Sequence, residues 1–151
     1  MVSLITVVRE TKGCEGQLIA VHDGKEYNFD IRTGSPSQKP KSEWATGKSG
    51  IPTGKHFLWN AHQYILQEGQ YSPKGGEIGE FHPVSSDKEQ YKYIYCADNK
   101  KLFRSIIGLH PENGIKGSAG CVVVVKEFEK LSKILKQTPL IHIPFNVEWK
   151  K

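Results

Sequence analysis

Short apolar runs separated by polar turns dominate the chain, a pattern typical of β-strands. Leu4–Val8 is a β-branched apolar run, and Gln17–Val21 and Glu26–Ile31 flank the sequence His22-Asp-Gly-Lys25. Because Asp-Gly favours a tight hairpin turn, the two flanking segments are predicted to pair as antiparallel strands. Further short strands are predicted at His56–Asn60, Tyr64–Gln67, Tyr91–Cys96, Leu102–Leu109, Cys121–Val125 and Leu140–Phe145.

One segment near the C-terminus has helical rather than alternating periodicity. In Lys126–Lys136, apolar residues recur at i, i+3, i+6 and i+7, namely Phe128, Leu131, Ile134 and Leu135. This spacing places them on one face and predicts an amphipathic helix.

Two further patterns complete the expected fold. Cys121–Val125 is nearly all valine, as in a strand buried on both faces. Glycine, proline and charged residues predict loops at Thr33–Gly54, Gln70–Glu89 and Pro111–Gly120. We therefore expect residues 1–151 to form a single, mainly β domain, a sandwich or barrel with one main C-terminal helix.

Charge and hydropathy narrow the range of partners. The 151 residues carry a net charge of +5, but the lysines are scattered and only Trp44 accompanies Lys39, Lys41 and Lys48, which does not favour nucleic-acid binding. No window of about 18 apolar residues is present, so no membrane insertion is expected. The N-terminal residues lack the basic, apolar and small-residue segments of a secretory signal, so synthesis in the cytoplasm is expected.

Cysteine usage argues against a scaffold of disulfides. Cys14, Cys96 and Cys121 are odd in number and include no C-x-x-C pair, although a Cys14–Cys96 bridge stays open. No cofactor or metal ion is expected, because a zinc site at His110 and Cys121 would need further ligands such as His82 and Cys96 from distant segments.

The stretch Ile106–Val125 contains the residues best suited to catalysis. A predicted strand ends at His110, a glycine-containing loop follows, and Cys121 opens the next strand. If these strands are neighbours, their backbones lie about 4.8 Å apart and the two side chains can meet. A nearby imidazole lowers the pKa of a thiol and can hold it as a thiolate–imidazolium pair. The pattern indicates a cysteine nucleophile with a histidine base.

The residues just before Cys121 suit the same chemistry. Gly120 permits a sharp turn, and the N–H groups of Gly120 and Cys121 can point at a developing oxyanion. Ser118 can order the loop or donate a hydrogen bond in the site. Each residue also has a purely structural interpretation: an inert buried cysteine, a capping histidine and a turn of small residues.

This motif resembles the L,D-transpeptidase catalytic-domain family, whose signature is a histidine, a loop, Ser/Thr-His-Gly-Cys, an apolar residue and arginine. The matching positions are His110, Ser118, Gly120 and Cys121. Thr46–Phe57 is similar to the family's upstream turn and strand, and the similarity extends over residues 26–143.

The chain departs from the family signature at three points. The loop after His110 is short, Ala119 replaces the second histidine, and Val122-Val123 stands where the arginine is usual. In these features it is similar to the short Gly-Ser-x-Gly-Cys variants of phage-associated proteins and type VI secretion effectors.

The resemblance implies an L,D-transpeptidase-like β-sandwich or barrel that acts on peptidoglycan stem peptides. Cys121 would attack the substrate carbonyl with His110 as base, and the acyl group would pass to an amine (transpeptidation or D-amino-acid exchange) or to water (carboxypeptidase or endopeptidase activity). Arg104, expected on the same strand as His110, is a candidate for binding a substrate carboxylate, with a solvated strand arginine as the alternative.

The resemblance also suggests a biological setting. An antibacterial effector made in the cytoplasm and exported to the periplasm or cell wall would need secretion machinery, and an immunity protein would protect its producer. The alternative is a catalytically inactive wall-binding or interaction module on the same fold, with Trp44 and Trp59 as sugar-stacking candidates. Papain-like peptidases have the opposite order of Cys and His, and sortases have an arginine after the cysteine.

Overall fold

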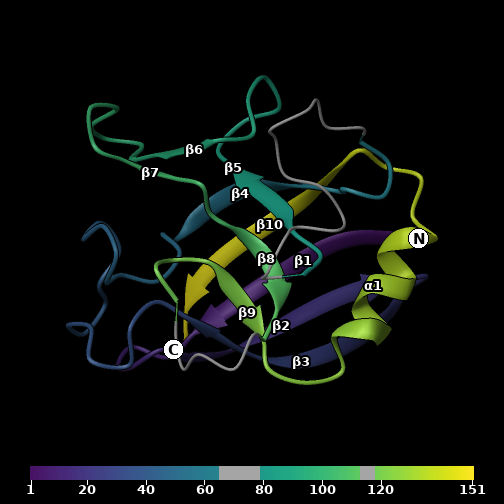
Figure 1. The fold of residues 1–151 in the computed structure, drawn as a ribbon, viewed down its shortest axis with the longest axis horizontal. Helices are drawn as coiled ribbons and strands as arrows, with labels where there is room; N and C mark the ends of the chain where they lie inside the picture. The colour runs from purple at the N-terminus through teal and green to yellow at the C-terminus, as the bar shows by residue number, and fades with distance from the viewer. Residues whose placement is uncertain (65–78, 113–117) are drawn as a thin grey trace.

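The computed structural model describes residues 1–64, 79–112 and 118–151 and is mainly β (Figure 1). Its elements are β1 (Val2–Arg9), β2 (Glu15–His22), β3 (Lys25–Thr33), β4 (Gly54–Trp59), β5 (His82–Ser85), β6 (Tyr93–Tyr95), β7 (Phe103–Ser105), β8 (Gly108–Pro111), β9 (Val122–Val124), α1 (Phe128–Lys136) and β10 (His142–Trp149). Among the described residues, no helix has the length and apolar composition needed to cross a bilayer.

Eight of these strands form a closed barrel in the order β1-β10-β4-β5-β8-β9-β3-β2. Two junctions are parallel, β1 with β10 and β8 with β9, and the other neighbouring pairs run antiparallel. Inward side chains such as Ile5, Leu18, Leu109 and Phe145 are fully buried and form one core. The fold class predicted from the hydrophobic pattern, mainly β with one C-terminal helix, is confirmed.

The β2–β3 hairpin forms where the Asp-Gly signal predicts it. Asp23 and Gly24 both have positive φ, 50° and 78°, as the turn that matches strand twist requires. The sheet register runs from Glu15 opposite Arg32 to His22 opposite Lys25. The predicted loop 33–54 is also confirmed, because β3 ends at Thr33 and β4 begins at Gly54.

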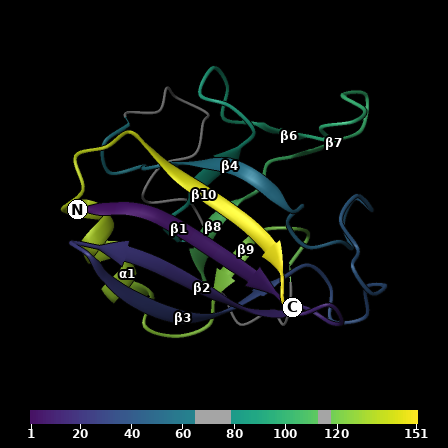
Figure 2. The same cartoon turned by 180° about the vertical axis from the view of Figure 1, so that it is seen from behind.

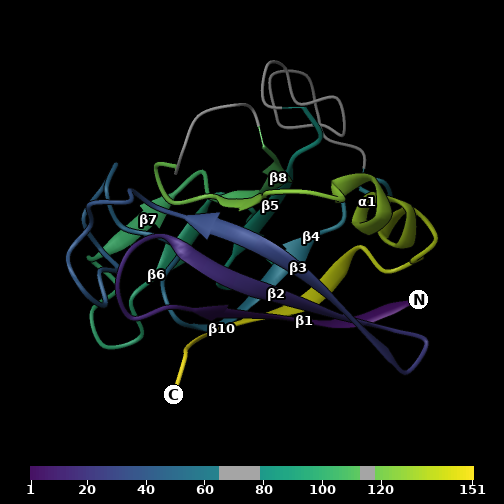
Figure 3. The same cartoon turned by 90° about the horizontal axis from the view of Figure 1, so that it is seen from below.

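Helix α1 covers the barrel at the end opposite the small β6–β7 sheet (Figures 1 and 3). Its buried residues are the four that the sequence periodicity predicts, Phe128, Leu131, Ile134 and Leu135. The view from behind in Figure 2 shows β1 and β10 side by side, with the N-terminus near α1.

The prediction of one continuous strand over Leu102–Leu109 is wrong. Ile106 takes a left-handed conformation with φ 59°, which interrupts the extended chain. The residues before it form β7, which pairs with β6, and those after it form β8 in the barrel. Arg104 therefore does not share a strand with His110.

Two other sequence predictions differ from the structure. β5 lies within the predicted loop Gln70–Glu89, and β10 extends well beyond the predicted Leu140–Phe145. Residues 65–67 of the predicted strand Tyr64–Gln67, residues 70–78 of that loop and residues 113–117 of the loop before Cys121 lie outside the described residues.

Candidate functional site

The parallel pair β8–β9 carries the residues predicted to be catalytic. His110 lies opposite Val123, and Cys121 precedes Val123 by two positions, directly before β9 begins. Because side chains two residues apart along an extended chain share a face, this register places the imidazole and the thiol on one side of the strand pair. For this diagonal the Cα atoms are about 8 Å apart, given about 4.8 Å between strands and about 3.3 Å rise per residue.

The His110 ring has a defined orientation. Its Nδ1 lies 2.8 Å from the Pro111 carbonyl oxygen, and because a carbonyl only accepts, Nδ1 carries the proton and Nε2 keeps its lone pair. Phe81 stacks on the ring with 6.1 Å between centroids and an interplanar angle of 22°. Burial lowers the pKa of His110, opposed by the Pro111 hydrogen bond. A neutral imidazole with a free Nε2 is the form that a general base requires.

The Cys121 sulfur lies against the kinked segment between β7 and β8. Its thiol donates a hydrogen bond to the Ile106 carbonyl with 3.7 Å between Sγ and O, and the Gly108 N–H donates to the sulfur. Burial raises the pKa of Cys121, while the Gly108 N–H and the positive charge of Arg104 lower it. The thiol is therefore the resting form at neutral pH.

These pKa directions differ from the thiolate–imidazolium pair that the sequence suggests. Both groups are less ionised than usual, and their hydrogen bonds lead to carbonyls rather than to each other. The physical reason is burial, which penalises a charge on either group.

Hydrogen bonds join the turn before Cys121 to the end of β3. The Ser118 hydroxyl donates to the Cys121 carbonyl at 2.7 Å and accepts from the N–H groups of Gly34 at 3.0 Å and Gly120 at 3.2 Å. Thr33 Oγ1 donates to the Gly120 carbonyl at 3.1 Å. The Gly120 N–H, one of the two predicted oxyanion donors, is thus directed at Ser118.

Arg104 lies beneath the same turn and is 3% exposed. Its Nη1 donates to the carbonyls of Glu43 at 2.8 Å and Gly50 at 3.2 Å, and its Nη2 donates to those of Ser49 at 3.1 Å and Ala119 at 2.8 Å. The guanidinium, predicted as a substrate ligand, is therefore surrounded by main-chain oxygens. The alternative of a solvated strand arginine is wrong because the side chain is buried.

No family model, curated protein or solved structure matches the chain. The functional argument therefore rests on the site itself.

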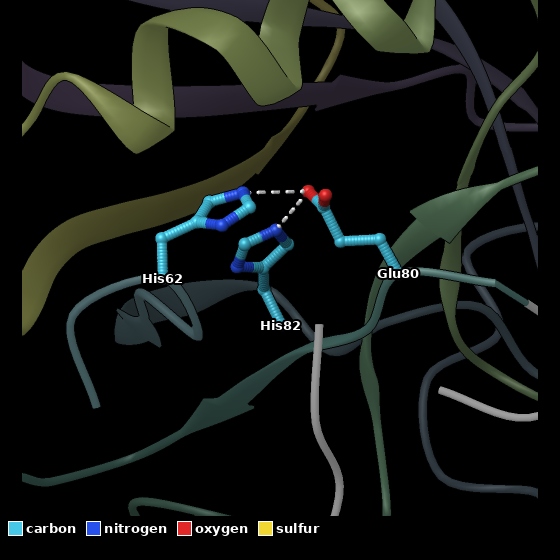
Figure 4. Close-up of side chains that lie close together, drawn as sticks. All are labelled: His62, Glu80 and His82. Carbon is cyan, nitrogen blue, oxygen red and sulfur yellow. Dashed lines mark hydrogen bonds and ion pairs between the residues drawn. The ribbon is translucent and has the colours of Figure 1, made fainter. Parts of the chain in front are cut away.

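A second polar cluster lies on the other face of the β5–β8 strand pair (Figure 4). The rings of His62 and His82 both point at the Glu80 carboxylate, with 3.2 Å and 2.6 Å between Nε2 and Oε2, and the Ser132 hydroxyl of α1 donates to Oε1 at 2.7 Å. The three ligand atoms lie within 4.8 Å of one another, close enough to hold a cation.

The tautomer of His82 argues for a proton rather than a cation in this cluster. The Ala61 N–H donates to His82 Nδ1 at 3.0 Å, so the ring proton sits on Nε2 and is donated to Glu80. A metal on Nε2 would force a protonated Nδ1 against the Ala61 N–H, whereas metal-bound histidines normally donate through that nitrogen. The cluster is a hydrogen-bonded tie between β5, the turn after β4 and α1.

The tryptophans predicted as sugar-stacking candidates have different settings. Trp59 is 5% exposed, and its Nε1–H donates to Ser85 Oγ at 2.8 Å, so its ring is part of the interior. Trp44 is partly buried and borders a cavity of about 410 Å³ that Tyr95, Lys55 and Lys100 also line. Of these two tryptophans, Trp44 is therefore the one that lies beside an open cavity.

Sequence reasoning missed the residues that support the site. Thr33, Gly34 and Phe81 touch it from segments far away in sequence, and no local motif marks them. The Ile106–Gly108 kink lies next to His110, but an apolar run gives no sign that its isoleucine is left-handed.

Proposed function

We propose that this protein is a cysteine acyl-transfer enzyme of the L,D-transpeptidase type that acts on peptidoglycan stem peptides. The observation that carries the proposal is the β8–β9 register, which brings the end of β9 that follows Cys121 beside the strand that carries His110. The peptide substrate comes from the sequence resemblance around Ser118, Gly120 and Cys121.

The chain's own groups supply the first step of this reaction. Cys121 Sγ attacks the carbonyl of the third stem residue while His110 Nε2 takes the thiol proton, and a C–S bond forms. In this reaction the Cys121 N–H would serve as the oxyanion donor. The tetrahedral species expels the D-alanine amine, which accepts the proton from His110. The acyl group then passes to an amine or to water, which restores the thiol.

The environment of the thiol supports chemistry over binding alone. An inert buried cysteine needs no oriented imidazole on the neighbouring strand, nor a backbone N–H directed at its sulfur. The inactive wall-binding module has less support, because Trp59 is buried.

The test is incubation of the protein with purified muropeptides and a D-amino acid, followed by mass spectrometry. The wild type is expected to release D-alanine or exchange it for the added D-amino acid. Cys121→Ala and His110→Ala are expected to lose this activity. Cys96→Ala removes another thiol that is not fully buried, and is the matched control that keeps activity. Unchanged muropeptides with the wild type would exclude the peptidoglycan substrate.

The setting of an exported antibacterial effector has its own experiment. Expression in a bacterium with a periplasmic targeting signal is expected to lyse or deform cells, whereas the same chain in the cytoplasm is expected to be harmless. Cys121→Ala is the control for both compartments, and toxicity from this variant would contradict an enzymatic effector.

A further inference from the structure

Arg104 is built into the site in a way that the proposed reaction does not yet use. Four carbonyl oxygens from Glu43, Ser49, Gly50 and Ala119 accept its Nη1 and Nη2 protons at 2.8–3.2 Å. Three of these four carbonyls belong to the 43–50 loop and the fourth belongs to Ala119, so the side chain joins that loop to the turn at residue 119. Such a network keeps the guanidinium in one place.

The Arg104 guanidinium also lies close to Gly120, the residue before the proposed nucleophile. A Cβ added at Gly120 would lie 2.5 Å from Arg104 Nη2, and Gly120 has φ 130°, which only glycine adopts without strain. The residue preceding Cys121 therefore has no side chain because the arginine fills that space. This close approach brings a fixed positive charge to the backbone that carries the thiol.

We propose that Arg104 is a positioning residue that holds the Ala119–Cys121 turn in place and stabilises the Cys121 thiolate as it forms, instead of binding a substrate carboxylate. The inference rests on Cys121 being the nucleophile of the proposed function, but not on the identity of the substrate.

The surroundings of the thiol support this role. Arg104 is the charged group that acts on the pKa of Cys121, lowering it against the opposing effect of burial. His110 faces the same side from β8, and the Arg32–Glu112 ion pair, 3.0 Å between nitrogen and oxygen, joins β3 to the end of β8. Among the described residues, His110 is neutral and the Arg32 charge is paired, so Arg104 is the cation placed to balance a sulfur anion.

The burial of Arg104 argues against a role as carboxylate ligand. Its two terminal nitrogens already serve four acceptors, and its 3% exposure leaves little surface for a substrate. Binding a carboxylate would break some of these bonds and release the turn that precedes the nucleophile.

The experiment measures alkylation of Cys121 as a function of pH by mass spectrometry of the labelled peptide, which needs no peptidoglycan. Arg104→Gln is expected to raise the midpoint by about one pH unit, so that alkylation below the midpoint is about tenfold slower. Arg104→Lys keeps a charge without the planar four-carbonyl network, and a smaller rise is expected. An unchanged midpoint in these variants overturns the proposal.

A pair of reagents separates the two roles of the arginine. Neutral iodoacetamide and anionic iodoacetate both report the thiolate, but only the second has a carboxylate. The proposal expects Arg104→Gln to slow both reagents by the same factor. A selective loss of the iodoacetate reaction would show that Arg104 binds carboxylates and would overturn the positioning role.

The matched control is Arg9→Gln. Arg9 is 1% exposed and donates to the Ile51 carbonyl at 2.7 Å and to Gln38 Oε1 at 3.0 Å, so its loss also removes a buried guanidinium. It is expected to lower stability but leave the alkylation midpoint of Cys121 in place. If Arg104→Gln does not fold, the midpoint of Arg104→Lys relative to wild type and Arg9→Lys decides the question in the same way. Absence of muropeptide turnover in the wild type, together with the expected midpoint shift in the Arg104 variants, would instead count against the proposed function alone.

Discussion

In the proposed reaction a single proton leaves the sulfur of Cys121 and arrives at Nε2 of His110. Both groups are uncharged at rest because burial opposes their ionisation, so the energy needed for charge separation must come from the bound substrate and the surrounding dipoles. The histidine and cysteine were visible in the sequence because they flank one loop. The sequence did not reveal that the Pro111 carbonyl orients the imidazole, because that role depends on the conformation of the ring.

Thr33 provides a prediction for the turn that bears the nucleophile. Its fully buried hydroxyl accepts from the Ile51 N–H at 2.8 Å and donates to the Gly120 carbonyl at 3.1 Å. Thr33→Val keeps the shape but leaves both buried groups unpaired, which is expected to cost about 3 kcal/mol of unfolding free energy. Urea denaturation measures the change.

The control for Thr33 is Thr33→Ser, which retains the hydroxyl and loses one methyl group. A cost of about 1 kcal/mol is expected for that variant. A loss in Thr33→Val that is no larger than the loss in Thr33→Ser would contradict a dominant contribution of the two hydrogen bonds.

At the scale of elements, the hydrophobic pattern predicted strands and the helix where the local sequence decides the outcome. The β2–β3 hairpin and α1 follow from Asp23-Gly24 and from the apolar spacing over 128–135. The break between β7 and β8 did not follow, because Leu102–Leu109 is apolar enough for one strand. Tertiary contacts, among them the Arg104 network and the Ile106 N–H to the Lys92 carbonyl at 2.9 Å, outweigh that preference.

At the break between β7 and β8, we expect a glycine substitution at Ile106 to stabilise the fold, whereas glycine usually destabilises a strand or helix. Ile106 has φ 59° and is 51% exposed, so Ile106→Gly relieves left-handed strain of about 1–2 kcal/mol and loses little burial. Glycine has more conformational freedom in the unfolded chain, which reduces this gain in unfolding free energy by about 0.5–1 kcal/mol. A small net rise in unfolding free energy is expected by urea denaturation.

Ile141→Gly is the matched control for the break. Ile141 is 43% exposed and is not among the residues with positive φ. Its replacement relieves no strain, so a loss of about 1 kcal/mol is expected. If both variants lose stability equally, the left-handed conformation stores no strain at residue 106.

The hydrogen bonds of Glu80, which link β5 to α1, give a second prediction at this scale. In Glu80→Gln one carboxylate oxygen becomes an NH₂, which faces either His82 Nε2 or Ser132 Oγ, and the charge of the acceptor is lost, so a loss of about 1–3 kcal/mol of unfolding free energy is expected. Ser132→Ala removes one donor and is expected to cost about 1 kcal/mol. Thermal melting compares the variants, and a rise in wild-type melting temperature with added Zn²⁺, absent in Glu80→Gln, would contradict the proton-sharing interpretation.

At the scale of the whole molecule, three buried histidines make stability depend on pH. Burial lowers the pKa of His56, His82 and His110. As pH falls through the ordinary histidine pKa, these rings bind protons in the unfolded chain but stay neutral in the folded chain. The free energy of unfolding therefore has its full value above that pKa and decreases below it.

The measurement is the unfolding free energy from urea titrations at about pH 7.5, 6.5 and 5.5, on either side of the ordinary histidine pKa near 6.5. A progressive decrease is expected, with each histidine contributing up to about 1.4 kcal/mol per pH unit. A free energy that is constant or rises over this interval would mean that these rings accept protons in the folded state.

The junction between β1 and β10 has a consequence for how the chain reaches this shape. Ile5 lies beside Phe145, 140 positions later in the sequence, so this edge of β1 is paired only when β10 is in place. Contacts so distant in sequence make folding slow, because the entropy of closing a long loop is lost before any pairing compensates it. Until β10 is in place, β1 and β4 are the unpaired edges of an open sheet, and the insertion of β10 between them closes the barrel.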